Sequence, residues 1–259
     1  MKKLLLILAA CLVVLGVAGK AKAEFAAGDL IRVVYQTSAS GGTYEAANDL
    51  GSVSSIMNGG ALASNTFNLW SSGYFTGGNV SSLEVAYFAT NAAGTELWTS
   101  GPEGVEESSD GCYWKYAVDR MLNLYQTYAG EATAPTDVVW YKKANPHSYY
   151  YTLDRDWNVM EIFPGTGTFG SFYATANGEA KLVSDGSVSQ DIFAWKYPMF
   201  SQSVSGSEML ITTVDASGNI TTAAGPGAGI GIPIPPSVLL LGSGLLGLAA
   251  IRKKEIFNF

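Results

Sequence analysis

The sequence is poor in the residue types on which many catalytic and metal sites depend. Its 259 residues include two cysteines and one histidine. Zinc sites are built mainly from Cys and His ligands, so a zinc centre is disfavoured, and we expect no cofactor. Charged residues are also scarce at 14% of the chain, with 15 Lys and Arg against 22 Asp and Glu.

The shortage of basic residues is strongest in the central part of the chain. Between Glu24 and Ile251, eight cations stand against 21 carboxylates, which gives a net charge of −13. A surface this acidic repels phosphate backbones, and no basic stripe with interleaved aromatic residues offsets the repulsion. Nucleic-acid binding is therefore excluded from the expected functions.

The residues that are abundant favour a folded, mainly β domain. The chain is 47% hydrophobic and contains 30 glycines and 14 tyrosines, a composition typical of a globular protein with many turns. Short runs rich in β-branched or aromatic residues are separated by turn signals such as Asn177-Gly178. These runs predict strands at 29–36, 82–90, 95–100, 137–143, 147–153, 168–176, 188–197 and 208–214.

One segment has helical periodicity instead. Apolar residues recur at spacings of four, three, four and three, at Trp114, Val118, Met121, Tyr125 and Tyr128. The pattern predicts an amphipathic helix over about 109–129, begun by Ser109 or Asp110 and ended at Gly130. Strands on both sides of the helix favour a single β-sandwich-like domain over 24–222, with the helix across a sheet face or over one end.

The N-terminus has the features of a secretory signal peptide. Two lysines, an apolar run and a small-residue site precede Glu24, so residues 1–23 are expected to be removed by signal peptidase after Ala23. In the alternative reading, Leu8 to Cys11 form a lipobox and Cys11 carries a lipid. Cleavage after Ala23 leaves Cys112 as the only thiol, so the exported chain forms no internal disulfide.

The C-terminus has the features of a tethered membrane segment. Residues 223–236 are rich in Gly and Pro and carry no charge, which predicts a tether. Residues 237–251 are apolar and, as a transmembrane helix, would span about 22 Å, against a hydrocarbon core of about 30 Å. The cations in residues 252–259 belong on the cytoplasmic side, which places the folded body outside, as the signal peptide also does.

The order of these features resembles a known sorting signal. A proline cluster, a short apolar helix and a basic cluster close the chain, and together they are similar to the PEP-CTERM signal of Gram-negative bacteria. Residues 232–235, Ile-Pro-Ile-Pro, stand where the namesake motif has Pro-Glu-Pro, and residues 255–259 extend past the basic cluster. The resemblance covers residues 232–254 only, and sorting signals are attached to unrelated domains.

The resemblance implies a route of export and a partner. In that family an exosortase, a membrane enzyme related to cysteine transpeptidases, recognises the tail, and the proteins are usually linked to extracellular polysaccharide. By resemblance, the prolines form the recognition and processing region, the helix is a temporary anchor at the inner membrane, and the cations are the stop. The residues concerned are Pro233, Pro235, Pro236, Arg252, Lys253 and Lys254.

A cysteine hydrolase is one function that the central region could support. Cys112 is expected in the first turn of the predicted helix, where the helix dipole lowers the pKa of a thiol. His147 is expected to open a strand, and Asp154 or Asp156 could orient it. This order is similar to that of papain-like peptidases, although no upstream glutamine is placed to serve an oxyanion hole. The alternative is that Cys112 packs in the core as a small apolar residue.

Two further sites are candidates. Asp154, Asp156 and Asn158 alternate, so in an extended chain their oxygens share one face and could bind calcium, although an Asx turn or a solvated strand explains them equally. Aromatic residues could instead form a sugar-stacking platform or simply fill the core. These are Trp70, Trp98, Trp114, Trp140, Trp157, Trp195 and Tyr149 to Tyr151.

Taken together, these patterns predict an exported surface or extracellular-matrix protein without catalytic activity, structural or adhesive in role. A carbohydrate-binding module of the exopolysaccharide matrix is the alternative, and a cysteine hydrolase using Cys112 and His147 is a second alternative.

Overall fold

Antiparallel strands make up most of the folded body. The structure, a computed structural model, describes residues 25–36, 42–62, 66–75, 79–104, 106–109, 114–132, 138–154, 180–197, 202–205 and 208–225. Its strands are β1 (Asp29–Gln36), β2 (Tyr44–Ser52), β3 (Phe67–Asn68), β4 (Leu83–Thr90), β5 (Glu96–Pro102), β6 (Glu106–Ser109), β7 (Val138–Lys142), β8 (Ala180–Lys181), β9 (Ser187–Lys196), β10 (Gln202–Ser205), β11 (Glu208–Val214) and β12 (Asn219–Ala224). Its helical segments are α2 (Val53–Ile56), η2 (Trp70–Ser72), η3 (Val80–Ser82), α3 (Trp114–Glu131) and η4 (Tyr150–Asp154). The mainly β class predicted from composition is confirmed.

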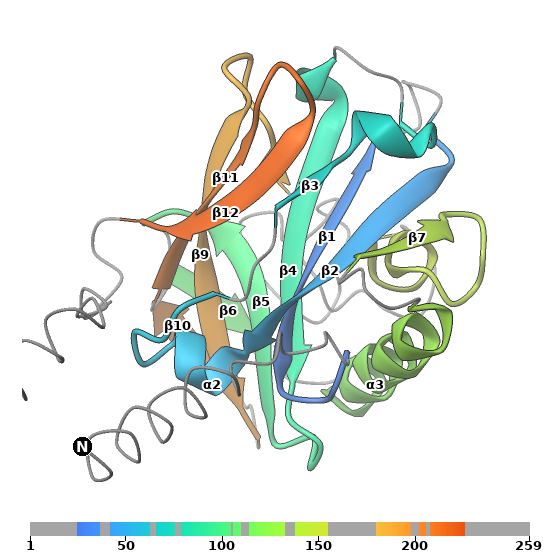
Figure 1. Cartoon of the computed structure of the whole chain (residues 1–259). Coiled ribbons are helices and arrows are strands. Elements are labelled where there is room, and N and C mark those ends of the chain that lie inside the picture. Colours follow the sequence, from blue (N-terminus) through green and yellow to red (C-terminus); the bar gives the residue numbers. More distant parts are fainter. Residues whose placement is uncertain are drawn as a thin grey trace, which may run out of the picture.

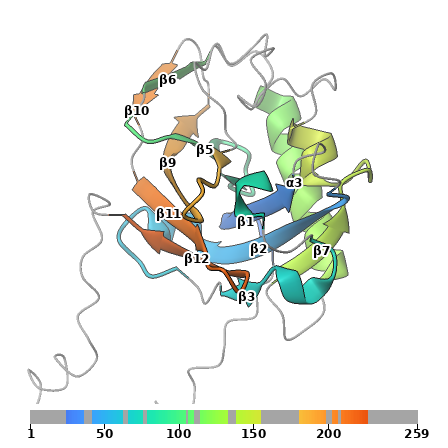
Figure 2. The same ribbon diagram turned by 90° about the horizontal axis from the view of Figure 1, so that it is seen from above.

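The main sheet is a single curled layer, where the sequence predicted a sandwich of two packed sheets. Its strands follow the order β3-β12-β11-β9-β5-β4-β1-β2-β7, with β8 paired to β4, while β6 and β10 form a separate pair. The sheet twists until its edges approach each other, so that the Phe67 ring on β3 lies 5.7 Å from the Trp140 ring on β7. Figures 1 and 2 show this nearly closed arrangement. Because the sheet curls, it covers its own inner face. In a sandwich, a second sheet would cover that face.

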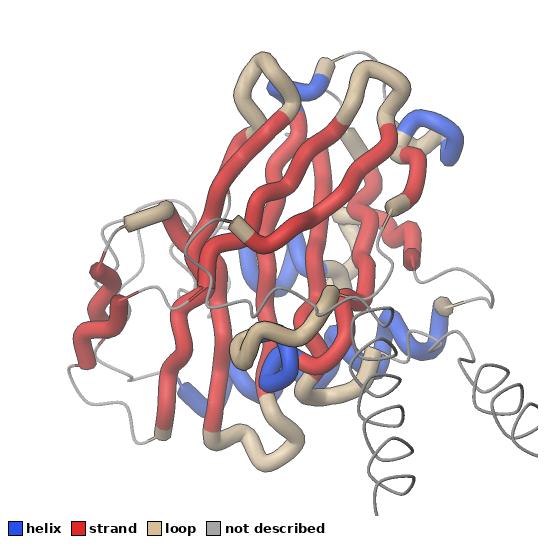
Figure 3. The backbone as a smooth tube through the Cα atoms, turned by 60° about the vertical axis from the view of Figure 1, so that its left-hand side comes forward, coloured by secondary structure: helices blue, strands red, loops and turns tan. Residues whose placement is uncertain are grey.

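Strand alternation divides the core into an inner and an outer part. On β1, Leu30 and Val34 point into the enclosed side, and Ile31, Val33 and Tyr35 point outward. The inner core joins residues from the middle strands and both edges of the sheet, and α2 adds Val53 and Ile56 at one end. The outer core lies between the sheet and α3. Both faces of the central strands are therefore buried, and Figure 3 shows these strands running side by side in one layer.

The helix α3 confirms the predicted apolar face but not the predicted start. Trp114, Val118, Met121, Tyr125 and Tyr128 are all buried against the sheet. Helix α3 begins at Trp114, and Ser109 is the last residue of β6, so Ser109 does not begin it. At the other end the helix runs through the predicted stop at Gly130 and ends one residue later, at Glu131.

Six of the eight predicted strands are confirmed as β1, β4, β5, β7, β9 and β11. The strand predicted at 168–176 and the turn at Asn177-Gly178 lie outside the described residues. The strand predicted at 147–153 is wrong, since His147 lies in a turn and Tyr150–Asp154 form the π-helical turn η4. Strand β12 includes residues 223 and 224, so the sheet extends two residues into the predicted tether.

The two ends of the chain are not described. The structure does not describe Ala23, the apolar segment 237–251 or the basic cluster. Within the part of the chain that the structure does describe, no helix is both long enough and apolar enough to cross a bilayer.

Gly186, in the turn before β9, has no room for a side chain. Its φ is +81°, and a Cβ atom would lie 2.2 Å from the Val214 carbonyl oxygen. We expect Gly186→Ala to lower the free energy of unfolding by about 3 kcal/mol, because backbone strain and a clash add together. Gly73→Ala is the matched control, since φ is +71° there and nothing lies within 4 Å. It should cost about 1 kcal/mol. Equal losses in urea unfolding would contradict the role of the clash.

Candidate functional site

A buried carboxylate ties three outer elements together. Both oxygens of Glu45 on β2 accept backbone N–H groups at the start of η4, from Tyr149 and Tyr150, each at 2.9 Å. The Tyr128 hydroxyl on α3 donates to the same carboxylate at 2.6 Å. Burial raises the pKa of Glu45 to about 7, and the hydrogen bonds and Lys143 act against that shift. These contacts explain why 149–154 is helical, since an extended chain could not present both N–H groups to one carboxylate.

The enclosed side of the sheet contains a buried cation. The Arg32 guanidinium donates to Thr222 Oγ1 at 2.7 Å and to Asn48 Oδ1 at 2.8 Å. The Tyr87 hydroxyl bonds to Thr222 and Thr212, which links β4 to β11 and β12 across the interior. Burial lowers the pKa of Arg32 to about 10, so it stays charged at neutral pH. This polar network joins strands that are far apart in sequence. Arg32 is fully buried, so solvent does not reach it.

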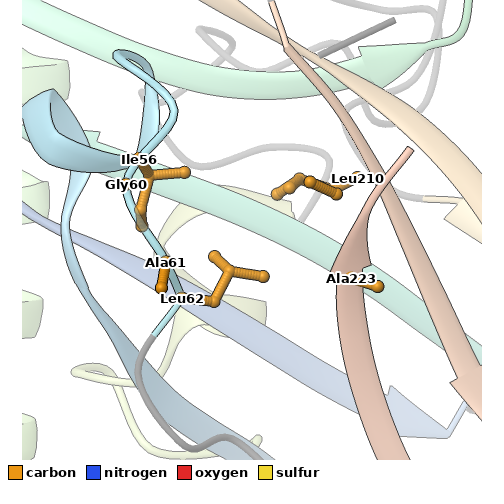
Figure 4. A pocket seen from close by; sticks show the side chains of 7 residues that line it. Ile56, Gly60, Ala61, Leu62, Leu210 and Ala223 are labelled. Atoms are coloured by element: carbon orange, nitrogen blue, oxygen red, sulfur yellow. The ribbon is translucent and has the colours of Figure 1, made fainter. Parts of the chain in front are cut away.

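A small apolar cavity lies at one end of the inner core. It has a volume of about 210 Å³ and lies between the loop after α2 and strands β11 and β12 (Figure 4). Ligand pockets are usually larger, at roughly 300–1,000 Å³, and carry a few polar groups that orient the ligand. The lining residues here are all apolar in type, so no polar side chain is present to orient a ligand. The lining residues are Ile56, Gly60, Ala61, Leu62, Leu210, Ala223 and Ala224.

Among the described residues, the surface feature best suited to binding is a cluster of rings where the two sheet edges meet. We call it the aromatic seam, and it consists of Tyr44, Phe67, Tyr74, Phe75 and Trp140. The Tyr44 and Tyr74 rings are stacked, with centroids 4.1 Å apart, and the Tyr74 ring lies 5.7 Å from that of Trp140. Trp140 also contacts Phe75 at 5.4 Å and Phe67 at 5.7 Å. Phe75 is buried, whereas Tyr74 is 43% exposed, so the seam has a buried base and an exposed top.

The segment that carries Tyr74 is held by several local contacts. Ser72 Oγ accepts the Tyr74 N–H at 3.1 Å and donates to the Leu69 carbonyl at 2.8 Å. Gly73 ends η2 with a φ of +71°, a conformation that glycine adopts without strain. The Leu69 N–H donates to the carbonyl of Gly218 in the turn between β11 and β12. Tyr74 is therefore an exposed ring on a firmly anchored turn.

One charged group lies beside the seam. Lys142 is exposed and pairs with Tyr44 across β2 and β7, and directly paired residues of antiparallel strands point to the same face of the sheet. The seam therefore combines an aromatic face with a neighbouring ammonium donor.

The predicted catalytic set is only partly visible. His147 is exposed, and its backbone N–H donates to the Asn145 side chain at 3.0 Å. Cys112 lies outside the described residues, as does Asp156, and the Asp154 side chain is likewise not described. The hydrolase therefore stays a prediction. One of its premises changes, because His147 lies in a turn and does not open a strand.

The predicted calcium ligands have a similar outcome. Asp154 is the last residue of η4, so the extended backbone assumed at that position is absent. Asp156 and Asn158 lie outside the described residues. Among the residues that the structure does describe, no three His, Cys, Asp or Glu side chains are grouped as metal ligands would be.

The predicted aromatic platform is largely core. Trp98, Trp114 and Trp195 are buried, and so is Tyr149, while Trp157 lies outside the described residues. Trp70, Trp140, Tyr150 and Tyr151 are half-buried. Only Trp140 of this predicted set belongs to the seam. Tyr44 and Tyr74 were not singled out, and no local pattern marks them, because their rings come together from segments about thirty residues apart.

Comparison with known families, proteins and structures identified no relative of this chain. No family model, no curated protein and no solved structure matches the chain.

Proposed function

We propose that this chain is an exported cell-surface or extracellular-matrix protein of structural or adhesive type, without catalytic activity. Its signal peptide directs export, and its C-terminal segment is the sorting signal on which an exosortase acts. The predicted topology places residues 24–222 outside the inner membrane. There the domain must stay folded without an internal disulfide. Burial of apolar residues on both faces of the sheet supplies the stability that this requires.

The observation that supports an adhesive role is the aromatic seam. Glu45 and Arg32, two large buried polar residues among those described, are bonded within the fold. The seam instead presents Tyr74 to solvent on an anchored turn. An exposed, rigid ring is a common anchor in recognition surfaces, since little conformational entropy is lost on binding.

The sorting part of the proposal is tested by replacing Pro233, Pro235 and Pro236 with Ala in the full chain. We expect unprocessed protein to accumulate in the inner membrane, because the recognition region is lost while the apolar segment is intact. Fractionation and the apparent mass of the chain measure this. Replacing Pro135 and Pro146, outside the signal, is the control and should leave processing unchanged. Normal processing of the triple variant would overturn the sorting proposal.

A further inference from the structure

We propose that the aromatic seam binds a neutral polysaccharide, with one hexopyranose ring lying against the exposed face of Tyr74. This inference names the ligand of the adhesive surface and to that extent rests on the proposed function. Tyr74 is the exposed large hydrophobic residue of the seam, so the proposed ligand makes contact through a flat face that matches one aromatic ring. The C–H face of a hexopyranose is flat and apolar, whereas its edge carries hydroxyl groups.

The geometry of the rings suits such a contact. The Tyr74 ring is stacked on the Tyr44 ring, with centroids 4.1 Å apart, and its centroid lies 5.7 Å from that of the tilted Trp140 ring. The 43% of Tyr74 that stays exposed is therefore presented by a ring that cannot easily turn away. A ligand ring that stacks on it gains contact area at a low entropic cost.

The polar groups of the seam match the edge of a sugar. Lys142 is exposed, pairs with Tyr44 across β2 and β7, and has an ammonium that donates. Tyr74 has a hydroxyl of its own, which both donates and accepts. A few polar groups at the margin of an apolar contact fix the orientation of a ligand.

Charge separates a neutral glycan from an anionic one. The region from Glu24 to Ile251 carries 21 carboxylates and eight cations, so the field around the body repels polyanions. Lys142 is a single exposed cation at the seam and does not reverse that field. The neutral class of polysaccharide is therefore favoured.

The size of the patch argues against a second copy of the chain as the partner. Among the described residues, the exposed large hydrophobic side chains are Tyr74, Val183 and Tyr197, and only Tyr74 belongs to the seam. A stable protein interface buries about 800 Å² on each partner. One exposed ring with a polar margin offers much less, but it matches one sugar ring.

The test uses the full chain, purified in a detergent without a sugar headgroup, and isothermal titration calorimetry. The probes are cellohexaose and maltohexaose as neutral hexamers and an alginate hexamer as the anionic comparison. We expect at least one neutral hexamer to bind. Tyr74→Ala should weaken that binding about tenfold, and Tyr74→Phe should keep it within about threefold, because the ring face is retained.

Tyr197→Ala is the matched control. Tyr197 is 60% exposed and packs on Trp114, away from the seam residues, so its loss should leave binding unchanged. Thermal unfolding of each variant shows that the fold is intact. The proposal is overturned if neither neutral hexamer binds, if only the alginate hexamer binds, or if Tyr74→Ala binds like the wild type. Binding by the purified chain does not depend on export. The sorting proposal can therefore fail while the binding proposal stands, and the two failures can be told apart.

Discussion

Glu45→Ala is expected to lower the free energy of unfolding by roughly 4 kcal/mol at pH 6. The substitution removes the acceptor for the Tyr128 hydroxyl and for the backbone N–H groups of Tyr149 and Tyr150. Tyr128 and Tyr149 are fully buried, so water does not readily replace the lost acceptor. Three elements, β2, α3 and η4, lose their common contact, and urea unfolding of the purified chain measures the loss.

Glu84→Ala is the control for this experiment. Glu84 lies on β4 and pairs with Lys181 at 3.9 Å, but the lysine side chain is 64% exposed. Exposed pairs contribute at most about 1 kcal/mol. A loss for Glu45→Ala that is no larger than the loss for Glu84→Ala would show that the buried carboxylate does not hold the outer elements together.

The free energy of unfolding is expected to fall as the pH rises from about 5 to 8. The pKa of Glu45 is about 7 in the folded protein, against an ordinary value of 4.5, because burial disfavours the charged form. Asp49 behaves alike, with a pKa of about 6 against 3.8, through burial and the nearby charge of Asp29. The folded state therefore binds more protons than the unfolded chain in this range. Stability is greatest below the ordinary pKa values of these two groups, and their contribution is lost as the pH rises through the folded-state values.

The size of the fall and its source can be measured. The shift at Glu45 corresponds to at most about 3 kcal/mol. Glu45→Gln, which cannot ionise, should remove most of the fall between pH 6 and 8, and Asp49 accounts for part of the remainder. Urea unfolding at several pH values gives the profile for both proteins. The same slope in wild type and Glu45→Gln would contradict the assignment.

Below about pH 4 the trend reverses. The pKa of Asp185 lies below its ordinary value because the Ser187 side chain and backbone donate to it, and the pKa of Asp215 is lowered by Asn219. Their contribution is lost as the pH falls through those lowered values. The profile is therefore expected to have a maximum near pH 4 to 5.

Local patterns predicted the elements whose residues face a core in a regular way. Strand β1 matches its predicted range of 29–36, because β-branched and aromatic residues dominate it. Helix α3 has the predicted apolar face, since its 3.6-residue period is visible in the sequence. Strand β2 was missed, because Ala, Asn, Asp and Gly in "YEAANDLGS" have low β propensity and only pairing with β1 and β7 on both sides makes it a strand.

The sequence by itself determined the mainly β class, the single amphipathic helix, the acidic charge and the scarcity of Cys and His. These properties depend on composition and on residues close together in the chain. Only the tertiary structure decided that one sheet curls on itself, that Glu45 turns 149–154 into a helical segment, and that Tyr44, Tyr74 and Trp140 form a seam. Each of these depends on contacts between residues far apart in sequence, and no local period records such contacts. Glu45 and Tyr150 are separated by 105 positions, and their hydrogen bond overrides a strong local preference for strand.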